Sequence, residues 1–396
     1  MTIIELSEEY SQQLASDQFE IEAARILRDD PKKRISVILP NALDNYYYLK
    51  SNGWVGFFPL TDRYTLHITP KVKTKNIFRM LEYAYKLESF EFLLGEVKVD
   101  SVEDVFENLA SILAKLVIER SRKGLYLDYV NMEENLQKLK GKINFLPSFL
   151  SISRGNTSIR CTYCEHTPDL IENQILLWTL YRLRKHQFVR ADVSHLLNLA
   201  YRELVNKVDI RDVKPSECIN RLYNRLNQNY EPMHLLCRFF LEHSGPGSEV
   251  GKEDFLPFML DMPNLFQQFV AEWLEQNLPS HYSIEKQYNA KLDDNDNFYF
   301  LIDLVLIDTS RQTVVAVLDT KYKKDKIDQG DIQQVIAYAA RMRTEKAFLI
   351  YPEVPPKEIN EKAGDIKIQN LFFDIREDIE ISGKAFLKDL ENKLNE

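Results

Sequence analysis

The stretch that most constrains this chain is FLIDLVLIDTSRQTVVAVLDTKYKK, residues 300–324, because it places charged side chains inside apolar runs. The two runs are typical of the strands of a β-hairpin whose turn lies near residues 308–312. In that hairpin Asp303 lies opposite or diagonal to Asp319, and strand alternation puts Lys321 on the same face as Asp319. Burial of these charges is costly unless they pair or bind a metal. The hairpin therefore predicts a charged site.

Two carboxylates beside a lysine suit metal-dependent hydrolysis of a phosphodiester. Carboxylate oxygens are hard ligands for Mg²⁺, which keeps bound waters for the attack, and a lysine can stabilise the pentavalent phosphorane. The spacing alone equally allows an edge hairpin with an Asp–Lys pair on the surface. The next segment, GDIQQVIAYAARM, places Asp331, Gln334 and Tyr338 on one helix face. That face could support the carboxylates or simply face solvent.

Composition sets the class of protein. The chain has 396 residues, of which 44% are hydrophobic and 28% charged, so we expect a soluble protein of two or three domains. No stretch approaches the ~18 apolar residues of a membrane span, and the N-terminus lacks signal-peptide features. We therefore expect no membrane partner and a cytoplasmic location. A net charge of −9 counts mildly against nucleic acid as a partner, although a local basic patch matters more.

Two further motifs bear on function. The C-x-x-C formed by Cys161 and Cys164 lacks the second pair that structural zinc normally needs, so reduced thiols are the simpler expectation. No G-x-x-x-x-G-K-[ST] motif occurs anywhere, so the chain is not expected to hydrolyse nucleotides by itself.

The chain divides into regions of different pattern. Residues 1–100 predict a mixed α/β domain, in which WVGFFPL and RYTLHITPKV form a β-hairpin. Residues 101–243 are mainly helical. Residues 244–254, rich in glycine and serine, are the predicted linker. Residues 255–396 predict an α/β domain with a mixed sheet flanked by helices.

Apolar periodicity places the individual elements. In the middle region we expect helices at 101–120, 169–188, 192–207 and 215–242, with long loops at 124–144 and 151–160. After the linker we expect a helix at 262–277, strands at 283–288, 297–307 and 313–321, a helix at 329–343, and strands at 346–352 and 367–374.

The charged hairpin and the helix after it also carry a resemblance. The order Asp303, Asp319-Thr-Lys321-Tyr322, Asp331-x-x-Gln334-x-x-x-Tyr338 resembles the PD-(D/E)xK nuclease superfamily. More narrowly, it resembles the McrC family, the nuclease subunit of McrBC-type modification-dependent restriction systems. GWVGFFPLTDRYTLHITPKV, LKGKINF and CEHTPDLIENQILLWTL also look like segments of that family, in its order. The resemblance covers most of residues 53–351.

The resemblance implies a PD-(D/E)xK nuclease domain and roles for particular residues. Asp303 and Asp319 would bind Mg²⁺, which Mn²⁺ can replace, and Lys321 would be the catalytic lysine. Gln334 and Tyr338 would complete the catalytic pocket. The implied partners are double-stranded DNA and a GTP-hydrolysing AAA+ McrB-like subunit, on which the N-terminal part docks and whose hydrolysis it stimulates.

Two residues depart from the family pattern. Ile302 stands where the family usually has proline before the first acid. Gln267 stands where many relatives have a helix glutamate that supports the metal, and an amide is a weaker cation ligand. Glu272 could replace that glutamate only in another helix register. The departures leave an alternative open, a non-catalytic assembly or regulatory subunit that docks on the NTPase partner and stimulates it.

Overall fold

The computed structural model falls into two compact units. One unit comprises the chain up to Phe106 together with the described residues from His243 onward, and the other comprises Glu107–Glu242. The predicted linker, residues 244–254, lies outside the described residues. The structure describes residues 2–41, 44–87, 101–155, 157–185, 189–243, 257–291, 298–323, 328–354 and 358–396.

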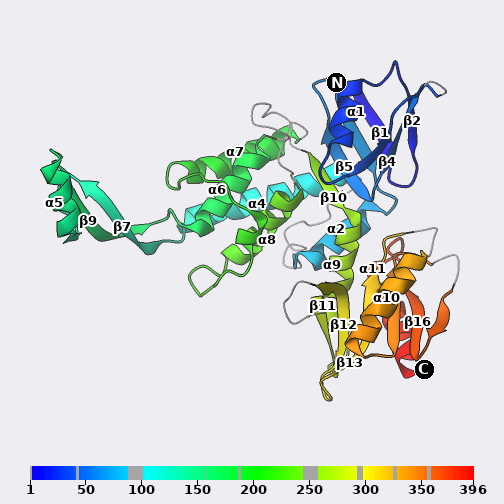
Figure 1. Cartoon of the computed structure of the whole chain (residues 1–396). Coiled ribbons are helices and arrows are strands. Elements are labelled where there is room, and N and C mark those ends of the chain that lie inside the picture. The colour runs from blue at the N-terminus through cyan, green and yellow to red at the C-terminus, as the bar shows by residue number, and fades with distance from the viewer. Residues whose placement is uncertain are drawn as a thin grey trace. The chain divides into compact units, whose positions relative to one another are not determined.

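The N-terminal part of the first unit is built on two small sheets. Its elements are β1 (Thr2–Ser7), β2 (Gln12–Ala15), α1 (Ile21–Arg28), β3 (Ile35–Ile38), β4 (Tyr46–Ser51), β5 (Trp54–Pro59), β6 (Tyr64–Thr69) and α2 (Thr74–Ala84). The predicted hairpin is confirmed, since β5 and β6 pair antiparallel. Strand β10 (Phe258–Asp261) pairs with β5, so the four-stranded sheet has the order β1-β6-β5-β10. The first element after residue 256, strand β10, is therefore part of the N-terminal sheet (Figure 1).

A six-stranded mixed sheet forms the C-terminal part of the first unit. Its elements are α9 (Met262–Asn277), β11 (Tyr282–Lys291), β12 (Tyr299–Asp308), β13 (Thr313–Thr320), α10 (Gln329–Met342), β14 (Lys346–Tyr351), β15 (Asn360–Ala363), β16 (Ile366–Phe372) and α11 (Ile379–Asn395). The order is β11-β12-β13-β14-β16-β15, with β13, β14 and β16 parallel. Every element that we predicted here is present, and β15 and α11 are additional.

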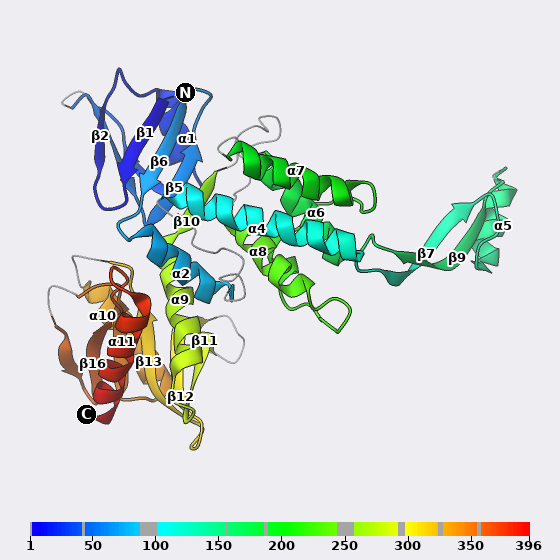
Figure 2. The ribbon, with the colours of Figure 1, turned by 180° about the vertical axis from the view of Figure 1, so that it is seen from behind.

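Helices cover both faces of this sheet. Helix α10 packs on β13, β14 and β16, where Val317, Val335 and Leu349 share one apolar cluster. Helices α9 and α11 cover the opposite face, as Figures 1 and 2 show from the two sides. There the Trp273 and Phe386 rings of the two helices meet edge to face at 6.0 Å. Burial on both faces explains the nearly uninterrupted apolar runs of the central strands.

The second unit is helical at its base and carries a β-arm (Figure 1). The Ser101 hydroxyl accepts a hydrogen bond from the Asp104 backbone N–H at 3.1 Å, and the Ser101 backbone N–H donates to the Asp104 carboxylate at 3.0 Å, which together form a capping box at the start of α4. The elements are α4 (Val102–Lys123), β7 (Asp128–Leu136), β8 (Lys142–Ile143), α5 (Phe145–Ser153), β9 (Ile159–Thr167), α6 (Ile171–Leu183), α7 (Ala191–Val205), the 3₁₀ turn η2 (Pro215–Cys218) and α8 (Tyr230–His243).

Two predictions for the middle region are wrong. The expected loops at 124–144 and 151–160 contain a three-stranded sheet, β7-β9-β8, and helix α5. The expected helix at 215–242 is α-helical only from Tyr230, because Pro215 starts a 3₁₀ turn and the chain then leaves helical geometry. On β9, Cys161 is buried and Cys164 is exposed, as their three-residue spacing along a strand requires. Among the described helices, none combines the length and apolarity needed to cross a bilayer.

A titrating contact joins the N-terminal sheet to the start of α4. His67 on β6 lies 2.9 Å from both Glu5 on β1 and Glu103 on α4, and the hydrogen bond with Glu103 leads in raising the pKa of His67 to about 9. A raised histidine pKa contributes stability that is fully present below its ordinary value of 6.5 and is lost as pH rises through about 9.

We expect His67→Gln to reduce the free energy of unfolding at pH 6 by about 1 kcal/mol, after allowance for solvent screening. The deficit should disappear above pH 9–10. Urea unfolding at several pH values measures it, with the exposed His195→Gln as the matched control. A deficit that did not change with pH would show that the imidazole contributes by packing alone.

Candidate active site

The site lies where β12 and β13 run side by side inside the sheet. Leu304 pairs with Leu318, and continuing that antiparallel register places Asp303 opposite Asp319. The two strands are interior to the six-stranded sheet, and the Asp319 side chain is only 2% exposed. The alternative of an edge hairpin with a surface ion pair is therefore wrong.

Burial makes Asp319 an unusual carboxyl group. Desolvation, followed by the charge of Asp303, raises the pKa of Asp319 to about 6, although Lys321 opposes the shift. The Lys321 Nζ lies 2.7 Å from Oδ2 of Asp319. That oxygen nevertheless accepts no hydrogen bond of ordinary geometry from the described residues. The Lys321 ammonium therefore supplies the positive charge that this buried carboxylate oxygen requires.

Asp303 is held more firmly than Asp319. Its Oδ2 accepts hydrogen bonds from the backbone N–H and the hydroxyl of Thr320, at 2.9 and 2.8 Å. Its Oδ1 accepts a hydrogen bond from Nε2 of Gln267 at 2.7 Å. Helix α9 places Gln267 there because Asp261 caps the helix, accepting a hydrogen bond from the Asn264 backbone N–H at 3.2 Å. Gln267 therefore orients the first acid.

Lys321 connects the acids to helix α10. Its Nζ donates a hydrogen bond to Oε1 of Gln334 at 2.9 Å, and Nε2 of Gln334 donates to the Tyr338 hydroxyl at 2.6 Å. The Tyr338 hydroxyl donates in turn to the Leu301 carbonyl at 3.0 Å. Burial alone would lower the pKa of Lys321, but the hydrogen bond to Asp319 and the charges of Asp319, Asp331 and Asp303 together raise the pKa above its ordinary value. The Lys321 ammonium is therefore charged at neutral pH.

A third acid stands behind the lysine. Asp331 is buried, and its carboxylate lies 3.6 Å from Nζ of Lys321 and 3.0 Å from Nζ of Lys323. The polar face of α10 is thus directed into the site, and the alternative of a solvent-facing stripe is wrong for Asp331 and Tyr338. The structure brings together all five residues that the sequence singled out: Asp303, Asp319, Lys321, Gln334 and Tyr338.

Three contacts of the site were not predicted from the sequence. They are the Thr320 hydroxyl on Asp303, the Gln267 amide on Asp303, and Lys323 on Asp331. In the sequence, Thr320 lies between Asp319 and Lys321, and this position was the signal from which its contact with the site could have been predicted. Glu272 takes no part, because its carboxylate lies 2.7 Å from the Lys286 ammonium.

The two opposed acids fit a magnesium ion. Mg²⁺ is usually held by one or two carboxylates together with waters and substrate phosphate, rather than by a full set of protein ligands. No group of three or more His, Cys, Asp or Glu suited to a metal occurs in the described part of the chain. Asp303 and Asp319 would therefore supply the protein ligands.

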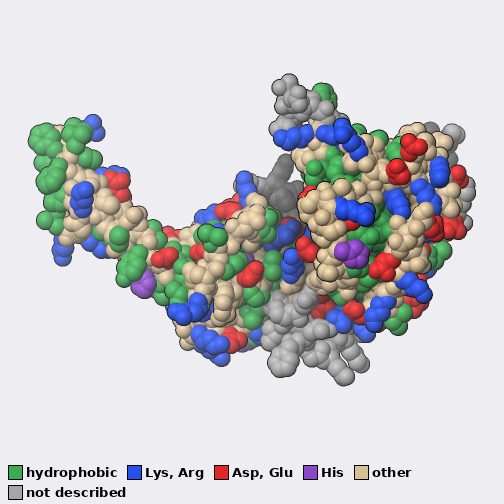
Figure 3. All heavy atoms as spheres, turned by 90° about the horizontal axis from the view of Figure 1, so that it is seen from below, with side chains coloured by type: hydrophobic (Ala, Val, Ile, Leu, Met, Phe, Trp, Pro, Cys, Tyr) green, Lys and Arg blue, Asp and Glu red, His purple; other side chains and the backbone are tan. Residues whose placement is uncertain are grey.

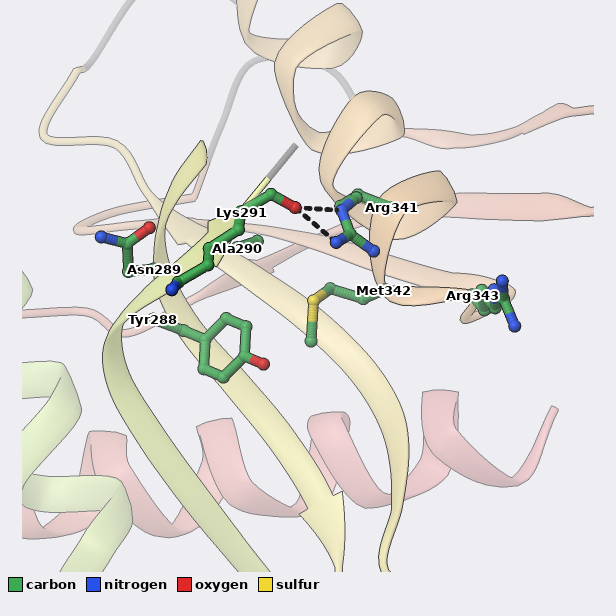
Figure 4. Close-up of a pocket in the computed structure, with 7 residues that line it drawn as sticks. All are labelled: Tyr288, Asn289, Ala290, Lys291, Arg341, Met342 and Arg343. Atoms are coloured by element: carbon green, nitrogen blue, oxygen red, sulfur yellow. Dashed lines mark hydrogen bonds between the residues drawn. The ribbon is translucent and has the colours of Figure 1, made fainter. Parts of the chain in front are cut away.

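A cavity of about 450 Å³ lies between the end of β11 and the end of α10 (Figure 4). Arg341 spans it, and its Nε donates a hydrogen bond to the Lys291 carbonyl at 2.8 Å. The lining residues are Tyr288, Asn289, Ala290, Lys291, Arg341, Met342 and Arg343. None of these residues belongs to the group formed by Asp303, Asp319, Lys321, Gln334 and Tyr338.

The β-arm of the second unit carries a separate apolar surface. Helix α5 exposes Phe145, Leu146 and Phe149 by 79%, 71% and 70%. Figure 3 shows hydrophobic side chains gathered at the end of this arm. Exposed apolar patches of this kind are typical of surfaces that interact with another molecule. We call Phe145–Ser153 the arm tip.

Comparison of the whole fold identifies its relatives. The chain superposes on one from the tetradecameric assembly of Thermococcus gammatolerans McrB AAA+ hexamers with bound McrC, with a TM-score of 0.58. The two chains are 18% identical, and the match covers 99% of this chain and 100% of the other. The cryo-EM structure of the Thermococcus gammatolerans McrBC complex matches with a TM-score of 0.47 at 16% identity, covering 99% and 100% of the chains. The 0.58 match shows a shared fold.

The sequence supplies the family. The chain is 24% identical over 310 residues to the type IV methyl-directed restriction enzyme EcoKMcrBC of Escherichia coli K12. The aligned region covers 72% of this chain and 87% of that relative. Residues 49–352 match the family described as McrBC 5-methylcytosine restriction system component. This match spans well over half of the chain, and the protein belongs to that family.

Proposed function

We propose that this chain is the Mg²⁺-dependent DNA endonuclease subunit of a McrBC-like restriction system and that residues 262–396 form a PD-(D/E)xK nuclease domain. The observation that carries the proposal is the pair formed by Asp303 and the buried Asp319, with the Lys321 ammonium 2.7 Å from the second acid. Bound Mg²⁺ would supply a Lewis acid and an activated water for phosphodiester hydrolysis. The protein's part is to hold two charged oxygens and one ammonium in fixed positions.

Each residue of the site has a role in this proposal. Asp303 and Asp319 bind the cation, and Lys321 neutralises the charge that develops on the phosphorane. Gln334 and Tyr338 hold the lysine through the hydrogen bonds described above. Gln267 holds Asp303 in place as a hydrogen-bond donor, which offsets the loss of the glutamate that many relatives have there.

We also propose that cleavage requires a GTP-hydrolysing AAA+ partner. The related assembly of Thermococcus gammatolerans contains McrB AAA+ hexamers with bound McrC, and the present sequence has no phosphate-binding P-loop of its own. The apolar arm tip offers this chain a surface for such a partner.

The arm tip also favours the second candidate, a non-catalytic subunit that docks on the partner and stimulates its GTP hydrolysis. Reconstitution with the partner, GTP and duplex DNA separates the two. The nuclease proposal expects strand cleavage that needs Mg²⁺ and stops in EDTA. Stimulated GTP hydrolysis without any cleavage, across methylated and unmethylated DNA, would favour the second candidate instead.

A further inference from the structure

The residue after the catalytic lysine is held by the N-terminal sheet. The Tyr322 ring lies against Lys71, whose Nζ is 4.0 Å from the ring centroid, a cation–π contact. The opposite contact of the ring is with Phe266 of α9, at 6.0 Å between centroids. The hydroxyl of Tyr322 is buried. Tyr322 is thus fixed by residues from two distant parts of the sequence.

Strand topology explains why Lys71 lies there. Strands β1 and β6 are parallel, so their carboxyl ends meet at the same edge of the N-terminal sheet. Glu8, which follows β1, donates its backbone N–H to the Thr69 carbonyl at 3.0 Å. The Glu8 side chain is buried, and its Oε2 accepts a hydrogen bond from the Lys71 backbone N–H at 3.0 Å. Glu8 therefore fixes the turn that presents Lys71 to Tyr322.

The same turn borders a small cavity against the C-terminal sheet. The cavity has a volume of about 130 Å³, and Lys71 and Val72 line one side of it. Glu353 and Arg376 line the other side and pair with each other at 2.8 Å. The turn after β6 thus borders the segments that follow β14 and β16, in addition to its contact with Tyr322.

Among the described residues, the backbone of Lys321 is tied to the sheet beyond β13 by the hydrogen bond from its N–H to the Ile350 carbonyl at 2.8 Å. Its side chain must nevertheless hold one position between Asp319 and Gln334. The neighbouring Tyr322 supplies the missing constraint, because a fixed ring limits rotation of the backbone on which Lys321 stands.

We propose that Lys71 and Tyr322 are positioning residues, through which the N-terminal sheet holds the catalytic lysine in place. The proposal rests on the proposed function for its catalytic consequence. It makes the N-terminal sheet part of the control of cleavage, because a displacement of the β1 and β6 ends is transmitted to Lys321 through one ring contact.

Lys71→Met tests the contact, because methionine keeps the apolar stem of the side chain and removes the cation. Lys71→Arg retains a cation for the ring, and the exposed Lys73→Met is the matched control. In the full chain assembled with the AAA+ partner, we expect Lys71→Met to lower kcat for DNA cleavage about tenfold. We expect KM for DNA and the stimulated GTP hydrolysis to be unchanged, and Lys71→Arg to restore most of the rate.

Hydrogen exchange of the full chain supplies a readout that does not need activity. Amides of residues 320–323 should exchange faster in Lys71→Met than in Lys73→Met, with no change in α11. Unchanged exchange at 320–323 would overturn the proposal, as would a Lys71→Arg variant as impaired as Lys71→Met. Faster exchange in a chain that never cleaves DNA would support the contact and remove the proposed nuclease function, so the two failures are distinguishable.

Discussion

Asp319→Asn is expected to lower Mg²⁺-dependent DNA cleavage by about 10³-fold or more while the protein stays folded. The substitution keeps the shape of the side chain but removes the charge that a divalent cation needs. Cleavage by the assembled complex measures the loss, and thermal unfolding of the isolated chain measures the stability. Cleavage at the wild-type rate would contradict the assignment of Asp319.

The same variant has an expected effect on stability in EDTA. The pKa of Asp319 is raised from 3.8 to about 6, so the stability that its protonated form provides is fully present below 3.8 and is lost as pH rises through about 6. Asparagine does not titrate. The difference in free energy of unfolding, Asp319→Asn minus wild type, should therefore increase by ~3 kcal/mol between pH 3.5 and pH 7.5.

Asp331→Asn is the matched control for both effects. Asp331 is buried beside Lys321 as well, but it contacts the two lysines rather than the pair of opposed acids. We expect its cleavage rate to fall by about tenfold at most, because the loss acts only through the position of Lys321. Equal losses in the two variants would mean that the site depends on total negative charge and not on a specific pair of ligands.

Lys321→Met is expected to lower the cleavage rate by about 10²–10³-fold, because it removes one fixed charge from the phosphorane. Its effect on metal binding should have the opposite sign. The ammonium lies 2.7 Å from Asp319 and repels a cation bound there. At a pH well above 7, Mn²⁺ affinity measured by calorimetry should therefore be retained or increased, whereas in Asp319→Asn it should fall.

Lys323→Met is the control for the lysine. Lys323 lies two residues further along, pairs with Asp331 at 3.0 Å and has a side chain that is 45% exposed. Its replacement should leave cleavage within a few-fold of the wild type. If Lys321→Met lost cleavage and Mn²⁺ affinity together, the lysine would be supporting the metal site and not the reacting phosphate.

The charged hairpin could be predicted from the sequence because the pattern that defines it is local. Strand alternation and a short turn place Asp303 opposite Asp319, and the helical period places Gln334 and Tyr338 on one face. The contacts of Gln267 and of Lys71 could not be derived in this way. Each comes from an element distant in sequence, and neither position breaks a local pattern of polar and apolar residues.

The β-arm shows a different limit of sequence reasoning. Strand β7 has no buried residue, and β9 buries only Cys161 and Tyr163, so neither strand carries a long apolar alternation of the kind that marks a half-buried strand. Helix α5 is apolar on exposed positions, so its pattern does not indicate a packed face. Strand β10 escaped prediction because only its pairing with β5 assigns FMLD to the N-terminal sheet.

The central claim is that Asp303 and Asp319 together bind a divalent cation beside Lys321. Anomalous scattering from crystals of the free protein soaked in Mn²⁺ tests it most directly. We predict a peak at about 2.0–2.3 Å from a carboxylate oxygen of each aspartate, with the Lys321 ammonium nearby. No peak in the wild type, at a Mn²⁺ concentration and pH that keep both acids ionised, would contradict the account.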